Sequence, residues 1–149
     1  MIKGALAALL LAPPPAAAQS LTGTWSCIED EGPSRMTITY AAGARFRAAF
    51  DLTLTSPRFG ESAMRGQVFG QYALEETGGT GRIVETPSSI RLAHLTWMGL
   101  LADDPALIGE LEGEVMSSLW GSGLVVWIDP DTHFRLDPRP FRGQCTRLR

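Results

Sequence analysis

Strict alternation of apolar and polar residues in the first half of the chain is the feature that most constrains its fold. Between Arg35 and Tyr40, and again between Arg45 and Thr55, every second residue is apolar. The segment 41–43 between these runs, Ala-Ala-Gly, ends on a glycine that a tight turn can use. A period of two over this length predicts an antiparallel hairpin with one buried face.

Similar patterns later in the chain predict further strands. Residues 62–74 form the longest of them, and Gly66 and Gly70 fall on its apolar side, which indicates bending or a close approach of another backbone. Pro87 separates two shorter candidates, because proline cannot donate to a sheet ladder. The shorter candidate strands are bounded by turn residues: 82–85, 89–97, 124–128, 133–136 and 141–148.

The pattern changes once, at Asp104. This residue suits the N-cap of a helix over about 105–119, with Pro105 in its first position. Apolar residues then recur at helical spacing: Leu107, Ile108, Leu111, Val115 and Leu119. A competing interpretation is a strand with Leu111 and Val115 pointing inward.

About eight or nine strands and one late helix place the chain in the mainly β class. Short strands joined by turns predict a calycin-like antiparallel barrel, a half-open barrel or a sandwich, with the helix inserted before the last strands. A single domain is expected over residues 19–149, because this length suits one core and 44% of the whole chain is apolar.

The first 18 residues have the features of a secretory signal peptide. Lys3 precedes an apolar run over 4–12, three prolines follow at 13–15, and Ala-Ala-Ala at 16–18 supplies a cleavage site before Gln19. The apolar run is shorter than the roughly 20 residues of a membrane-spanning helix. We therefore expect a periplasmic or secreted protein. The absence of Asn and of any lysine after Lys3, a bias of GC-rich bacterial genomes, favours the periplasm.

Two cysteines, Cys27 and Cys145, stand near opposite ends of the predicted domain. In an oxidising compartment such a pair indicates one structural disulfide; two free buried thiols or a metal pair are the alternatives. If the bond joins neighbouring antiparallel first and last strands, Trp25 lies opposite Arg147, because each is two residues from its cysteine. The guanidinium can then stack on the indole. Otherwise the cysteines join distant strands and Arg147 is solvated.

The opening of the domain resembles the lipocalins and the wider calycin group. Gly23 and Trp25 form the Gly-x-Trp motif at the start of the first strand, and Arg147 lies on the last strand. The resemblance implies a barrel in which this arginine packs over the tryptophan. The lipocalin helix usually follows the last barrel strand, whereas two or three strands follow it here, and the chain is short for that family.

The motifs predict no catalytic, cofactor-binding or metal-binding residue. His94 and His133 lack neighbours at zinc-ligand spacing, and the sequence around Ser122 is not a nucleophile elbow. The tryptophans are expected to fill the core or, where exposed, to contact a partner; the alternative is that they line a ligand pocket. They are Trp97, Trp120 and Trp127.

Two functions remain as hypotheses. The first is a non-catalytic binding protein that holds a small apolar ligand inside the barrel. The second is a protein-interaction module, such as an envelope accessory subunit or an inhibitor of a periplasmic enzyme. An empty apolar interior would favour the first; a filled barrel with an exposed aromatic cluster would favour the second. The net charge of −3 argues against nucleic acid, and no membrane span is expected.

Overall fold

The computed structural model describes residues 20–57, 60–118, 120–136 and 142–149. They form nine strands and one helix: β1 (Gly23–Glu29), β2 (Arg35–Ala41), β3 (Arg45–Ser56), β4 (Gly60–Thr77), β5 (Thr80–Trp97), β6 (Leu100–Leu101), α1 (Pro105–Ser118), β7 (Ser122–Asp129), β8 (Thr132–Arg135) and β9 (Gly143–Leu148). The signal peptide expected over 1–18 lies outside the described residues.

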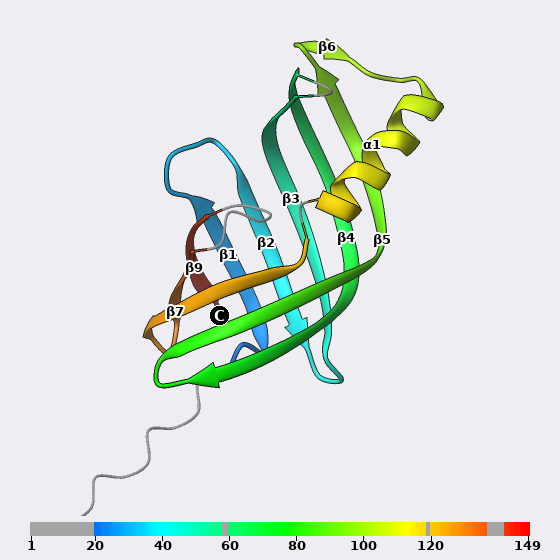
Figure 1. The fold of residues 1–149 in the computed structure, drawn as a ribbon. Coiled ribbons are helices and arrows are strands. Elements are labelled where there is room, and N and C mark those ends of the chain that lie inside the picture. The colour runs from blue at the N-terminus through cyan, green and yellow to red at the C-terminus, as the bar shows by residue number, and fades with distance from the viewer. Residues whose placement is uncertain (1–19, 58–59, 119, 137–141) are drawn as a thin grey trace, which may run out of the picture.

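Eight strands close into an antiparallel barrel. Each pairs with the next along the chain, β5 pairs with β7, and β9 returns to β1. The short β6 pairs only with β5 and lies outside the ring. This arrangement confirms the mainly β barrel with one helix before the last strands, and the closure of β1 on β9 distinguishes it from a half-open barrel or a sandwich (Figure 1).

The two strands expected on either side of Pro87 are one continuous strand, β5, so that prediction was wrong. Pro87 lies opposite Gly70, next to a break in the β4–β5 register at Phe69/Gly70. On its other edge β5 pairs with β7 only over residues 80–84. Proline is tolerated at irregular or unpaired positions of a sheet, because no ladder hydrogen bond requires its missing N–H.

The seam between β1 and β9 has the register expected from the cysteines. Cys27 lies directly opposite Cys145 and forms a disulfide with it, and Trp25 lies opposite Arg147. Both cysteines are fully buried. The disulfide therefore joins the first and last strands of the barrel.

Aromatic side chains fill the barrel where its wall carries glycine. A Cβ added at Gly66 would lie 2.9 Å from the Phe50 ring and 2.4 Å from the Arg91 carbonyl oxygen. At Gly70 it would lie 2.7 Å from the Phe46 ring and 2.2 Å from a backbone oxygen. The β4–β5 register is irregular at both glycines. The close approach predicted for them is confirmed, and the space they leave is occupied by phenylalanine.

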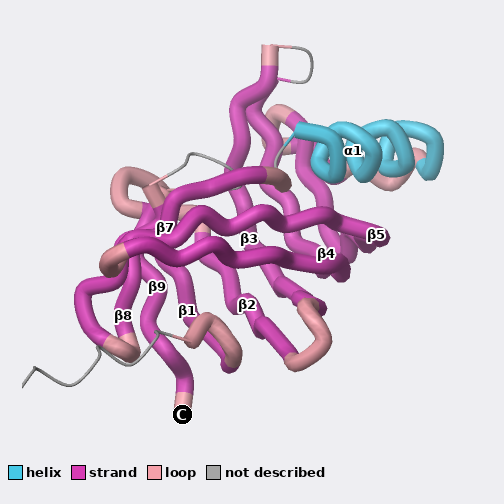
Figure 2. The backbone as a smooth tube through the Cα atoms, turned by 60° about the horizontal axis from the view of Figure 1, so that its bottom comes forward, coloured by secondary structure: helices cyan, strands magenta, loops and turns pink. Residues whose placement is uncertain are grey.

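Helix α1 lies outside the barrel, along the part of β5 that β7 leaves unpaired (Figure 2). Asp104 caps it, since its carboxylate accepts hydrogen bonds from the N–H groups of Ala106 and Leu107. Leu111 and Val115 are buried. The side chain of Glu112 accepts a hydrogen bond from the backbone N–H of Leu92 at 3.1 Å, so the helix satisfies part of the strand edge that it covers.

Replacing Leu111 with alanine is expected to destabilise the protein by about 2–5 kcal/mol, because this side chain is core. Gly109→Ala is the matched control on the same helix. A Cβ at Gly109 meets nothing within 4 Å, so this change should stabilise by about 0.5–1 kcal/mol through helix propensity. Urea unfolding measures both. Two changes of the same sign and size would contradict the helix docking.

In the described part of the chain, no helix is both long enough and apolar enough to cross a lipid bilayer.

Candidate functional site

Arg147 meets the motif residues Gly23 and Trp25 where β1 pairs with β9. The Arg147 guanidinium carbon lies 4.2 Å from the Trp25 ring centroid, which confirms the predicted stacking. The same guanidinium donates to the carbonyl oxygens of Thr22 and Ser20 and forms an ion pair with Asp131. Gly23 has φ +131°, and a Cβ there would lie 2.6 Å from an Arg147 nitrogen. The motif thus ties the segment before β1 to the β7–β8 turn, a structural role.

A buried ionic cluster crosses the barrel interior, and the sequence analysis did not predict it. Arg135 on β8 makes a bidentate ion pair with Glu85 on β5, with N–O distances of 2.7 and 3.0 Å. The Tyr40 hydroxyl on β2 donates to Glu85 and accepts from Arg135. The Arg135 and Glu85 side chains are 3% and 0% exposed. Three strands from different parts of the barrel are therefore joined through side chains that are almost fully buried.

The protonation of this cluster follows from its burial. Burial and the Glu85 carboxylate raise the pKa of Tyr40 well above its usual value, so the phenol stays neutral. Burial by itself would lower the pKa of Arg135, but Glu85 and Tyr40 raise it above its usual range. The guanidinium therefore stays charged. Each of the three side chains hydrogen-bonds to both of the others.

His133 lies between two indole rings in the same interior. Its ring centroid is 4.5 Å from that of Trp25 and 5.0 Å from that of Trp127, with edge-on geometry in both cases. Among the described residues neither of its nitrogens has a hydrogen-bond partner. Burial, and then the positive charges of Arg135 and Arg147, lower its pKa to about 3. His133 is a neutral packing residue in the folded protein.

This histidine makes folding stability fall in mild acid. The unfolded state accepts a proton on His133 below about pH 6.5, whereas the folded state resists it down to about pH 3. The free energy of unfolding is therefore expected to decrease by about 1.4 kcal/mol per pH unit below pH ~6.5. Unfolding measured at pH 6.5 and pH 5, above most carboxyl titration, should show this slope in the parent and not in His133→Leu. Equal slopes would contradict the assignment.

Other candidates from the sequence are not brought together. His94 is half-buried near the C-terminal end of β5, whereas His133 lies on β8. No group of three metal-ligating side chains occurs in ranges 20–57, 60–118, 120–136 and 142–149.

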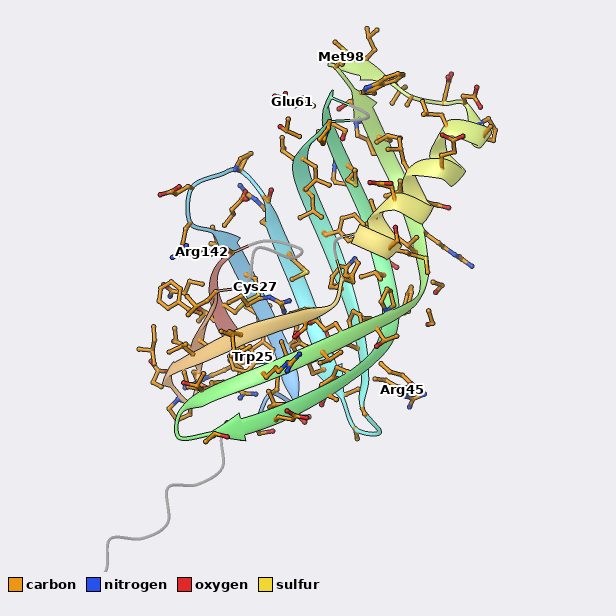
Figure 3. The ribbon with its side chains drawn as sticks, viewed as in Figure 1. Trp25, Cys27, Arg45, Glu61, Met98 and Arg142 are labelled. Atoms are coloured by element: carbon orange, nitrogen blue, oxygen red, sulfur yellow. A yellow bond between two sulfur atoms is a disulfide. The ribbon has the colours of Figure 1, made fainter. Side chains whose placement is uncertain are left out.

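Among the described residues, the hairpin of β5 and β6 carries a cluster of exposed apolar side chains. We call it the apolar tip and define it as Trp97, Met98, Leu100 and Leu101. Their exposed fractions are 37%, 72%, 75% and 64%. The hairpin lies at the far end of β5, beyond the barrel (Figure 1), and Met98 stands at its extremity (Figure 3). Of the three candidate tryptophans, Trp97 is exposed, whereas Trp120 and Trp127 are buried in the core.

The turn at the apolar tip carries a backbone conformation that apolar residues avoid. Met98 has φ +50° and Gly99 has φ +78°, with Trp97 paired to Leu100 across them. Two-residue hairpins of this kind favour Asn or Gly at the first position, and a left-handed conformation costs other residues about 1–2 kcal/mol. A long apolar side chain is thus held outward at a local energetic cost. Such cost is typical of functional positions.

Carboxylates flank the apolar tip. Glu61 is exposed on the neighbouring strand, and its carbonyl oxygen accepts the N–H of Met98 at 2.8 Å. Asp103 is exposed just beyond Leu101, and the two residues line one small hollow of about 100 Å³. Asp104 follows at the helix start. The exposed apolar side chains of the tip are therefore flanked by acidic residues.

No protein-family model matches this chain, and no curated protein sequence matches it.

Proposed function

We propose that the protein is a non-catalytic interaction module that docks onto a protein partner through the apolar tip. The observation that carries this proposal is the exposure of four large apolar side chains in and beside one two-residue turn beyond the barrel. An exposed apolar cluster of this kind typically marks an interaction site. The filling of the barrel by Phe46, Phe50 and the Arg135 cluster favours this function over a ligand carried inside.

The charges around the tip indicate the chemistry of the partner. The apolar tip would insert into a pocket on the partner, and the carboxylates of Glu61 and Asp103 would then face the rim of that pocket. We therefore expect an apolar pocket with lysine or arginine at its edge. An anionic bilayer is disfavoured, because it would repel the same carboxylates.

The disulfide supports an oxidising compartment, and we propose the periplasm, where an accessory subunit or an enzyme inhibitor would act. A distant kinship with the lipocalins belongs to this proposal as well.

Photo-cross-linking identifies the partner. A benzophenone amino acid at position 98 is expected to cross-link to one protein in the native cells, and the same probe at Leu148, exposed on the outer wall, should not. The partner is then purified and its affinity measured. Leu100→Ser should weaken binding at least tenfold, as for a central contact residue, whereas Leu148→Ser should not. Asp103→Lys should slow association.

Two results would overturn the proposal. One is equal affinity of the parent and Leu100→Ser for the purified partner. The other is cross-linking to lipid together with binding to vesicles of neutral or anionic phospholipid that Leu100→Ser abolishes, which would make the tip a membrane contact.

A further inference from the structure

The outer wall of the barrel carries a second concave surface, on the opposite side of the sheet from the filled interior. It is a hollow of about 640 Å³ across β2, β3, β4 and β5, within the size range of small-molecule sites. We call it the outer-wall pocket. The outward-facing side chains that line it include Arg45, Arg47, Phe69, Gln71 and Pro87.

Strand register explains how these side chains meet. Arg47 on β3 lies between Thr39 on β2 and Phe69 on β4. One step along, Arg45 lies between Ala41 and Gln71. Arg45 and Arg47 are two residues apart on one strand, so both point outward on the same side.

The hollow occurs where β4 and β5 lose regular register. The irregularity lies between Phe69 and Gly70, with Pro87 opposite Gly70. A bulge bends a strand and redirects its side chains, and Gly70 and Pro87 leave little bulk at this point. An adjoining hollow of about 280 Å³ shares Thr39, Arg47 and Phe69 with the first. Arg47 and Phe69 therefore line both hollows.

The two arginines are available to a ligand. Ion pairs hold Arg65, Arg135, Arg142, Arg147 and Arg149. In the part of the chain that the structure describes, neither Arg45 nor Arg47 has a carboxylate partner. Phe69, which is 38% exposed, provides an apolar surface next to them. Guanidinium groups bind oxyanions by paired hydrogen bonds, and an aromatic ring packs against a flat apolar body.

We infer that the outer-wall pocket binds a small anionic amphiphile, with its single oxyanion between Arg45 and Arg47 and its apolar body against Phe69. This site is independent of the apolar tip, which lies at the far end of β5.

Two fluorescent probes with nearly the same ring system test the inference. Anilinonaphthalene sulfonate carries one oxyanion, and N-phenyl-1-naphthylamine has none. The parent protein is expected to bind the sulfonate more tightly than the neutral probe. Arg47→Gln should weaken the sulfonate about tenfold, the loss of one charged hydrogen bond, and leave the neutral probe unchanged. Phe69→Ser should weaken both.

Arg91→Gln is the matched control, because Arg91 is exposed on β5 and does not line the pocket. It should leave both affinities unchanged. Equal loss of sulfonate binding in Arg47→Gln and Arg91→Gln would overturn the inference, since only the overall charge would then matter. Loss of probe binding in Leu100→Ser, with Arg47→Gln unaffected, would also overturn it and place the probe on the tip. If no protein partner binds the apolar tip but the probes behave as expected, the inference of the outer-wall site still stands.

Discussion

Arg135→Met is expected to destabilise the protein by about 3–5 kcal/mol, because it leaves the Glu85 carboxylate buried without its counter-charge. The Tyr40 hydroxyl alone remains as a partner for that carboxylate. Urea unfolding at neutral pH measures the effect. The loss arises from the unpaired charge and not from the pair's own net contribution, since desolvation offsets much of the attraction within a buried pair.

The double variant Glu85→Leu with Arg135→Met separates these two contributions. It is expected to be more stable than Arg135→Met alone, because no buried charge remains. The exposed pair Arg65–Asp51, whose side chains are 61% and 54% exposed, is the surface control, and Arg65→Ala should cost at most about 1 kcal/mol. If Arg135→Met were no more harmful than Arg65→Ala, the cluster would not hold the barrel together.

Removal of the disulfide has the second large expected effect. Replacing Cys27 and Cys145 together with alanine should lower the free energy of unfolding by about 2–5 kcal/mol, because the bond closes a chain separation of 118 residues. The chain has no other cysteine, so thiol exchange cannot confuse the comparison. Reduction of the parent protein should reproduce the loss. A double variant as stable as the oxidised parent would show that strand pairing alone secures the β1–β9 seam.

The seam is also where the sequence was most informative. Two cysteines constrain the pairing of two strands, and a two-residue offset then places Trp25 opposite Arg147 without any further assumption. Alternation was equally reliable for β2 and β3, because each has one face in the core and one in water. Gly66 and Gly70 were recognised as points of close approach, since a glycine on the apolar face of a strand leaves room that a neighbouring group can fill.

The errors and omissions share a physical origin in contacts between distant strands. Pro87 suggested an end to β5, but the open edge and the local bulge tolerate it. Glu85 and Arg135 both point inward. Each lies two residues after a buried residue of its strand, Ile83 on β5 and His133 on β8. A charged residue at a position where the strand's alternation predicts a core residue was the signal that could have indicated this cluster. Only the closed barrel shows that the two meet, because no local rule pairs β5 with β8. The function proposed for the tip depends likewise on a feature that the structure reveals, the positive φ of Met98 in the turn.

Native mass spectrometry of the protein isolated from its own cells tests the docking of the tip most directly. The parent protein is expected to appear as a complex with one other polypeptide, and Leu100→Ser, isolated in parallel, as the free chain. Leu148→Ser should retain the complex. A complex of equal abundance in the parent and Leu100→Ser, or a parent protein found only as the free chain, would contradict the proposal that the apolar tip is the binding site.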